Sequence, residues 1–214
     1  MKQFTVPMAL LDFVPVTLFF TGSFLVGKDL KKQMNMASRI LYCTGIFFVT
    51  AAGTLKALYK LIYAIGVGDI KFMNGQFFPN EAFGFLFAGA GLLISLGKEK
   101  KRQNTTYALL PTGALVGMII VGMGAMYAVL CKHASRLGKP LVIVLYVVSF
   151  FLSVFMGYLS SHDFDSALMN WIAQAINTVS QICFFAGCMI LHKNGLGEKE
   201  TISISDMVTE SVLQ

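Results

Sequence analysis

The stretch ILYCTGIFFVTAAGTLKALYKLIYAIGVGDIKFMNGQFFPNE, which runs from Ile40 to Glu81, decides the fold of this chain. It begins as an apolar segment long enough to cross a bilayer, because a membrane-spanning helix needs about 20 residues. Two lysines, Lys56 and Lys60, stand about one helical turn apart inside this segment. The next apolar segment opens with the acidic residue Glu81. Because charge inside a bilayer is costly, these ionisable residues are candidates for a functional site.

The composition of the whole chain indicates an integral membrane protein. Of its 214 residues, 56% are hydrophobic and only 13% are charged, and the mean hydropathy is +0.68. Long apolar blocks predict an all-α, polytopic protein, because lipid cannot satisfy open backbone groups and the blocks are too long for barrel strands. The net charge of +6 is gathered in short clusters at the ends of these blocks. Cytoplasmic loops and lipid headgroups select this pattern, which does not require nucleic acid as a partner.

Six apolar blocks predict six transmembrane helices in the plasma membrane. They cover Val6–Gly27, Ile40–Val67, Phe78–Gly97, Thr106–Cys131, Pro140–Ser160 and Asn170–Leu191. We expect a six-helix transmembrane domain over residues 1–192 and a polar C-terminal tail over residues 193–214. Basic residues are divided almost evenly between the two sides of the membrane. The charges around the first span favour placing both termini outside.

The two halves of the domain, residues 1–97 and 106–192, share a layout that favours a three-plus-three inverted repeat. Each half has a first span with an early proline, a basic connection, a second span, an acidic connection and a third span. The sequence Leu-Phe-Ala-Gly at 86–89 in one third span matches Phe-Phe-Ala-Gly at 184–187 in the other. Three crossings in each half would invert the second copy, a construction common in secondary transporters.

The first candidate site combines charged residues from three predicted spans. Counting from the span ends at about 1.5 Å per residue puts Asp12, Lys56 and Glu81 roughly 5–6 Å inside the same boundary. Lys60 lies at the rim on the same side. One interpretation is a structural ion-pair network, in which lysine also extends its ammonium to the interface. The other interpretation is a site for a ligand or an ion.

The second candidate site is a face of polar amides in the last span. The four amides are Asn170, Gln174, Asn177 and Gln181. Their spacing places them on one face of a helix, and the last of them lies near the middle of the membrane. The amides could hydrogen-bond to the serines of the fifth span, or they could form the polar lining of a cavity. If successive spans alternate in direction, this amide face extends toward the middle of the membrane from the side opposite the charged residues.

The connection between the fifth and sixth spans contains His162, Asp163 and Asp165. These residue types suit a metal site or hydrolysis at the interface, but a convincing metal site needs a further ligand at a suitable spacing. A cap for the following helix explains the same residues. We therefore predict no metal, no cofactor and no catalytic residue.

Together, the two polar zones favour a small secondary transporter or permease for a small polar solute, anionic solutes included. The residues expected to bind it are Asp12, Lys56, Lys60, Glu81, Gln174, Asn177 and Gln181. One alternative is a membrane interaction or sensor subunit, in which the polar groups hold helices together. The other is an integral membrane enzyme acting at the interface. The expected partners are the lipid bilayer and the solute, and association into a homo-oligomer stays open.

Overall fold

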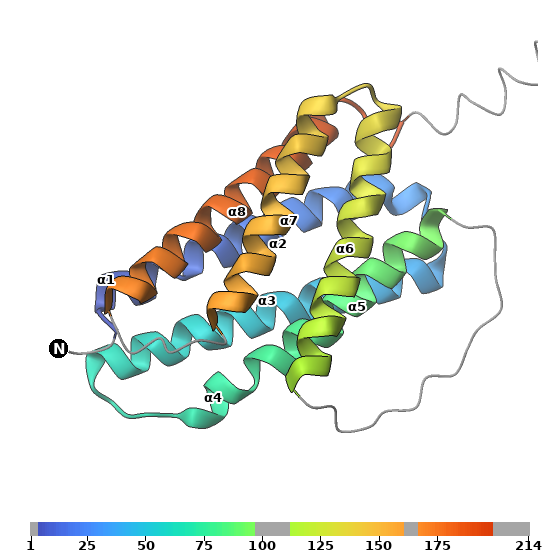
Figure 1. Ribbon diagram of the computed structural model, residues 1–214. Coiled ribbons are helices and arrows are strands. Elements are labelled where there is room, and N and C mark those ends of the chain that lie inside the picture. The colour runs from blue at the N-terminus through green and yellow to red at the C-terminus, as the bar shows by residue number, and fades with distance from the viewer. Residues whose placement is uncertain (1–3, 97–111, 161–166, 199–214) are drawn as a thin grey trace, which may run out of the picture.

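A computed structural model of the chain describes residues 4–96, 112–160 and 167–198, and the regular structure in these ranges is entirely helical (Figure 1). The all-α class predicted from the sequence is confirmed. The elements are α1 (Val6–Leu11), α2 (Phe13–Asp29), the 3-10 helix η1 (Leu30–Lys32), α3 (Met36–Ile65), α4 (Lys71–Gly75), α5 (Phe77–Leu96), α6 (Thr112–Arg136), α7 (Pro140–Ser160) and α8 (Ala167–Lys193).

Several parts of the described chain are long and apolar enough to cross a membrane. These five stretches are Val6–Lys32, Met36–Ile65, Phe72–Leu96, Ala114–Arg136 and Leu168–Lys193. A shorter apolar stretch, Pro140–Met156, lies in α7. Large apolar side chains also point outward, such as Phe24 and Phe47, which are 60% and 68% exposed. So many exposed large apolar side chains, together with the helix lengths, indicate a membrane protein.

The first span is broken into two helices at Asp12. α1 ends at Leu11 and α2 begins at Phe13. The break follows from Pro15, which has no backbone N–H, so the carbonyl of Leu11 loses its usual donor four residues further along. The bend holds Asp12 in a buried position, where only 8% of its surface is exposed.

The second span is one long helix with clear signals at both ends. The side chain of Asn35 accepts a hydrogen bond from the backbone N–H of Ser38 at 2.8 Å and caps the start of α3. Gly66 ends the helix in the left-handed conformation, with φ of 84°. The 30 residues of α3 extend about 45 Å, so the helix tilts or projects beyond the hydrocarbon core.

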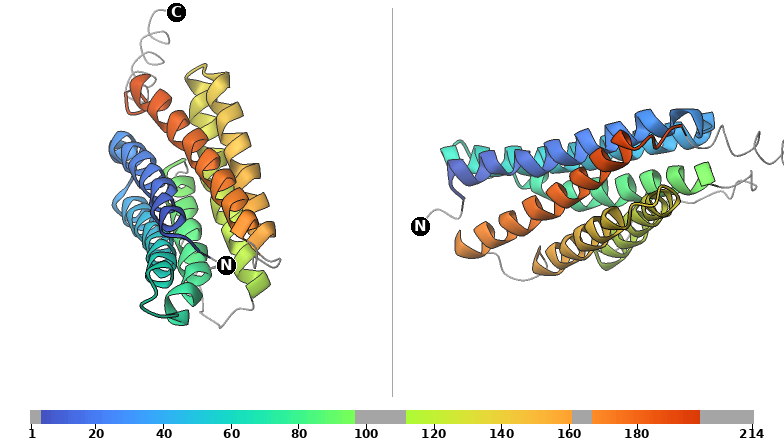
Figure 2. Two further views of the ribbon diagram at one scale, coloured as in Figure 1. Left: turned by 90° about the vertical axis from the view of Figure 1, so that its left-hand side faces the viewer. Right: turned by 90° about the horizontal axis from the view of Figure 1, so that it is seen from above.

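The long helices pack in chain order around the bundle (Figure 2). Contacts join α2 to α3, α3 to α5, α5 to α6, α6 to α7 and α7 to α8, and α8 returns to pack against α2. Glycines permit the closest approaches. A Cβ atom on Gly45 of α3 would collide with the backbone of Gly84 and Ala88 in α5. Such small-residue contacts are typical of helices that associate within a membrane.

The second half of the bundle runs in the same direction as the first, so the expected inverted repeat is not confirmed. α6 is parallel to α5, since Gly122 lies against Phe85 and both helices begin at the same end of the bundle (Figure 1). α8 is parallel to α2, since Gly22 lies against Phe184 and Asp29, further along α2, contacts His192, further along α8. In an alternating topology, the chain between the third and fourth spans stays on one side of the membrane. In the structure, the end of α5 and the start of α6 lie at opposite ends of the bundle (Figure 1), and the joining residues 97–111 are outside the described ranges.

The two ends of the described chain also lie at opposite ends of the bundle. Phe4 packs on the aromatic rings of Tyr59 and Tyr63, near the end of α3. Leu196 lies at the other end, where its carbonyl accepts a hydrogen bond from Nε2 of Gln33 at 3.2 Å. Leu196 is buried, so the first part of the expected polar tail packs against the helices. Residues 199–214 are outside the described ranges.

An aromatic layer fills the middle of the bundle. Phe19 stacks on Phe184 with ring centroids 5.5 Å apart, and Phe85 and Tyr127 contact these two rings edge-on. These side chains come from α2, α8, α5 and α6. Beyond the layer, aliphatic side chains close the end of the bundle where those four helices end. They include Leu30, Leu92, Leu130 and Leu191, none of which is more than 1% exposed.

Candidate functional site

The half of the bundle where α2, α5, α6 and α8 begin is hollow. It encloses a cavity of about 410 Å³ that opens beside the exposed Asn74. The floor of the cavity consists of Phe19, Phe85 and Met123, which belong to the packed centre. A volume of this size lies within the range of cavities that hold small ligands.

All seven residues that the sequence singled out for solute binding line this cavity. They are Asp12, Lys56, Lys60, Glu81, Gln174, Asn177 and Gln181. The charged residues and the amides were expected to approach from opposite sides of the membrane. The structure instead brings them to the same end, because α8 runs parallel to α2. Asn170, which begins the amide face, also lines the cavity.

One wall of the cavity carries a buried ion pair. Nζ of Lys60 lies 2.6 Å from Oδ2 of Asp12, and the two side chains are 13% and 9% exposed. Asp12 lies at the break between α1 and α2, and its carboxylate contacts Lys60 of α3 there. The sequence placed Asp12 at the depth of Lys56, and the structure pairs its carboxylate with Lys60, one helical turn nearer the rim. Lys60 also lies near the ring of Phe4, with its Nζ 5.6 Å from the ring centroid.

Lys56 and Glu81 occupy the same wall. Nζ of Lys56 lies 3.7 Å from the centroid of the Phe77 ring, a favourable cation–π geometry. Lys56 and Glu81 also attract each other electrostatically. Phe77 stands one helical turn before Glu81 in α5, so the same helix supplies both the ring and the carboxylate. The described lining therefore carries two positive and two negative side chains, whose formal charges cancel.

The amide wall opposite has hydrogen-bonding capacity that the protein does not use. Gln174 is only 6% exposed, and its Nε2 is buried without a hydrogen-bond partner among the described residues. The same holds for Oε1 of Gln181 and for Oγ1 of Thr50, which lines the cavity from α3. A buried polar atom without a partner costs free energy, so these atoms are places where water or a ligand would bind.

Serines join α7 to α8. Oγ of Ser149 donates to the carbonyl of Ser180 at 2.8 Å, and Oγ of Ser180 donates to the carbonyl of Ser149 at 2.9 Å. Oγ of Ser153 lies 2.8 Å from Oγ of Ser180. The sequence indicated the α7 serines as partners for the amides, but Ser180 beside the amide face is the partner that they use. Association of α7 and α8 thus leaves the amide face directed at the cavity.

Sequence reasoning missed Thr50 and Phe77, which line the same cavity. A signal for both is present in the pattern. Thr50 shares the cavity face of α3 with Gly53 and Ala57, at helical spacing of three and four residues. Phe77 precedes Glu81 by four residues, which also places it on the same helix face.

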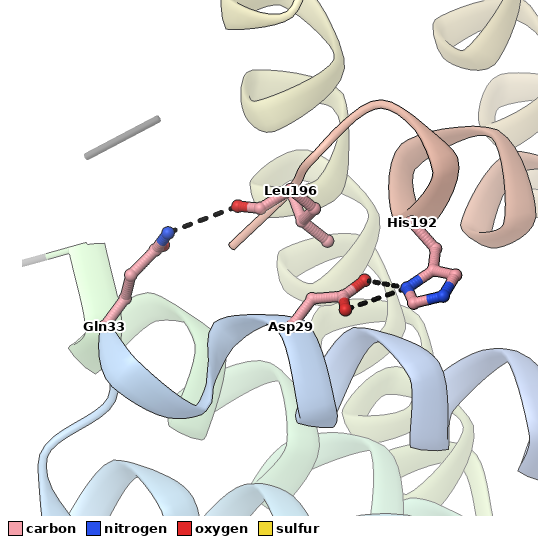
Figure 3. A network of polar contacts seen from close by, with 4 residues as sticks. All are labelled: Asp29, Gln33, His192 and Leu196. Carbon is pink, nitrogen blue, oxygen red and sulfur yellow. Dashed lines mark hydrogen bonds and ion pairs between the residues drawn. The ribbon is translucent and has the colours of Figure 1, made fainter. Parts of the chain in front are cut away.

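The closed end of the bundle is held by polar contacts between the first and last parts of the chain (Figure 3). Nδ1 of His192, near the end of α8, lies 2.8 and 2.9 Å from the two carboxylate oxygens of Asp29 at the end of α2. Gln33 reaches the carbonyl of Leu196 just beyond. These contacts join the two halves of the bundle on the side opposite the cavity mouth.

The connection that contains His162, Asp163 and Asp165 lies outside the described residues. Within the described ranges, no group of three or more histidine, cysteine, aspartate or glutamate side chains is arranged to hold a metal ion.

The cavity can hold a molecule through charged groups, through amide hydrogen bonds and through aromatic walls. Comparisons with protein-family models, with curated proteins and with solved structures found no match to this chain. Its function is therefore inferred from the residues of the cavity.

Proposed function

We propose that this chain is a small secondary transporter or permease of the plasma membrane, and that a small polar solute binds in the 410 Å³ cavity. The observation that carries the proposal is Gln174, which lines the cavity inside a bundle of apolar helices and whose Nε2 is buried without a partner among the described residues. A protein that used this amide only to join helices would pair it with a neighbouring side chain.

The shape of the bundle supports transport in particular. The cavity opens at one end, and the aromatic layer and the aliphatic packing close the other end. A transporter that exposes its site to one side at a time needs such a half-open arrangement. The charged wall belongs to the first half of the chain and the amide wall to the second. Transporters built from repeats bind their substrates at the interface between the repeats, and parallel repeats are one of the known forms.

Six membrane-spanning helices are part of the proposal, and the parallel directions of α5 and α6 then require the chain to return across the membrane between Leu96 and Thr112. α7 has 21 residues, which extend about 31 Å, close to the hydrocarbon thickness of a bilayer. It packs between α6 and α8, each of which contains one of the five longer apolar stretches. A helix in this position crosses the membrane together with its neighbours.

Uptake into liposomes that contain the purified full-length protein tests the proposal. We expect accumulation of at least one labelled polar solute from a panel of sugars, polyols, amino acids and carboxylates. Gln174→Met removes the amide while keeping the length of the side chain, and we expect it to abolish this uptake. Thr21→Val removes a hydroxyl that hydrogen-bonds only within α2 and does not line the cavity, and it should transport normally. Binding without uptake of any solute would contradict transport and favour a sensor subunit.

A further inference from the structure

We propose that the cavity binds a net-neutral, polyhydroxylated solute, because its charged side chains compensate one another and its uncommitted hydrogen-bonding groups both donate and accept. This inference rests on the proposed binding function of the cavity and narrows its substrate from polar solutes in general. It replaces the broader expectation from the sequence that anionic solutes are included.

The charges of the cavity are already committed to one another. Lys60 holds Asp12 at 2.6 Å, and Lys56 lies over the ring of Phe77 while Glu81 of the same lining attracts it electrostatically. An anionic solute would have to draw a lysine away from its carboxylate. That carboxylate would then be left without its cation in a largely buried position, which is costly. A cationic solute meets the same obstacle with the signs reversed. A solute without net charge leaves both pairs in place.

The uncommitted polar atoms select the hydrogen-bonding character of the solute. Nε2 of Gln174 is a donor, Oε1 of Gln181 is an acceptor, and Oγ1 of Thr50 can act as either. A carboxylate only accepts and an ammonium only donates, so neither satisfies all three atoms. A hydroxyl group both donates and accepts. Hydroxyl groups therefore match the hydrogen-bonding character of each of these three atoms.

The remaining walls suit the carbon skeleton of such a solute. Phe19, Phe85 and Met123 form an apolar floor, and Ile119 and Ile120 extend this surface along α6. Contact with these side chains buries C–H groups without removing any hydroxyl from a polar partner. A polyol or a sugar presents both kinds of surface, whereas a small inorganic ion presents only one.

The test is thermal unfolding of the purified full-length protein in detergent, with probes at matched millimolar concentrations. The neutral probes are myo-inositol, D-glucose and glycerol, and the charged probes are succinate, phosphate and choline. We expect at least one neutral probe to raise the Tm in a saturable manner, since a ligand that binds the native state stabilises it by mass action. The charged probes should leave the Tm unchanged.

Gln181→Met is the decisive variant, because methionine has nearly the shape of glutamine but lacks its acceptor. We expect the unliganded variant to unfold at the wild-type temperature or above it, and the shift by the neutral probe to disappear. Thr21→Val should retain the full shift. Polyols also stabilise proteins without binding, by exclusion from the surface. A shift that persists unchanged in both Gln181→Met and Gln174→Met would have that origin and would overturn the inference.

Two further outcomes separate this inference from the proposed transport. A larger shift by succinate, phosphate or choline that depends on Gln181 would overturn the neutral class and leave the cavity as the binding site. The inference also fails when none of the neutral probes shifts the Tm. Saturable binding of a neutral probe without uptake into liposomes would support the inference and contradict transport.

Discussion

At the scale of single residues, the ion pair of Asp12 and Lys60 links the bend of the first span to α3. Both side chains are largely buried, so removing one partner leaves the other charge uncompensated, at a cost of about 3–5 kcal/mol. We expect Asp12→Asn to lower the free energy of unfolding by this order. Removing both charges, with Asp12→Asn and Lys60→Gln together, should recover most of the loss. The measurement is denaturant unfolding in micelles.

The same measurement distinguishes an ion pair from a lysine that reaches water on its own. Lys60 lies near the mouth of the cavity, and a long lysine side chain can extend its ammonium to the interface. If Asp12→Asn alone left stability unchanged, Lys60 would have moved to water and the pair would have no structural role.

A second prediction at this scale concerns the stability cost of the amide at Gln174. A buried polar atom without a partner costs about 1–3 kcal/mol, and replacement by an apolar group of similar shape removes this cost. We therefore expect Gln174→Met to raise the free energy of unfolding of the unliganded protein by about 1 kcal/mol while solute binding is lost. A clear loss of stability in Gln174→Met would instead indicate that this amide helps to hold helices together.

At the scale of elements, the packing of α5 against α6 depends on Gly122. A Cβ atom there would collide with the backbone of Phe85 and Leu86, which cannot move aside as a side chain can. We expect Gly122→Ala to destabilise the protein by about 1–3 kcal/mol through overpacking. Gly117 lies on the same helix with open space around it, so Gly117→Ala should be neutral or slightly stabilising. Equal stability of the two variants in thermal unfolding would contradict the close contact of α5 and α6.

The elements also show what the sequence could predict. The shared depth of Asp12, Lys56 and Glu81 below the span ends could be predicted by counting residues. The rise of an α-helix is constant, and polar residues mark the span ends. The face shared by Gln174 and Gln181 followed from helical periodicity in the same way. Both properties are local, so the amino-acid pattern of one helix contains them.

The direction of a helix relative to a distant neighbour is not a local property. The basic run after α5 indicated a short connection on one side of the membrane, and strict alternation then placed the amides opposite the charges. The structure places α6 and α8 parallel to α5 and α2, so the two candidate sites become one cavity. Periodicity cannot detect this difference, because a helix presents the same face whichever end it begins from.

At the scale of the whole molecule, the direction of the second half can be tested by the side on which thiol labels react. Val67 follows α3 and Leu168 begins α8, and both are exposed at the end of the bundle that holds the cavity mouth. On a background without the native cysteines, we expect Val67→Cys and Leu168→Cys to react with an impermeant reagent from the same side. Met36→Cys, at the start of α3, should react from the other side. Reaction of Val67→Cys and Leu168→Cys from opposite sides would contradict the parallel arrangement and support the alternating topology.

The closed end of the bundle offers the most direct test of transport. The contact of Asp29 with His192 joins α2 of the first half to α8 of the second, beyond the aromatic layer that forms the cavity floor. A solute that enters at the mouth can leave on the other side only if these two helices separate there. We therefore expect a covalent link between Asp29→Cys and His192→Cys, made by oxidation or a short thiol cross-linker, to stop uptake into liposomes.

Binding should survive this link, because Gln174, Gln181 and the charged pairs lie on the mouth side of the floor. A reducible link gives the control within one sample, since reduction should restore uptake to the level of the unlinked double variant. The Tm shift by the solute, measured before and after reduction, should stay the same. Uptake that continues through a fully linked protein would mean that the solute does not pass between α2 and α8, and the proposed path through the closed end would be wrong.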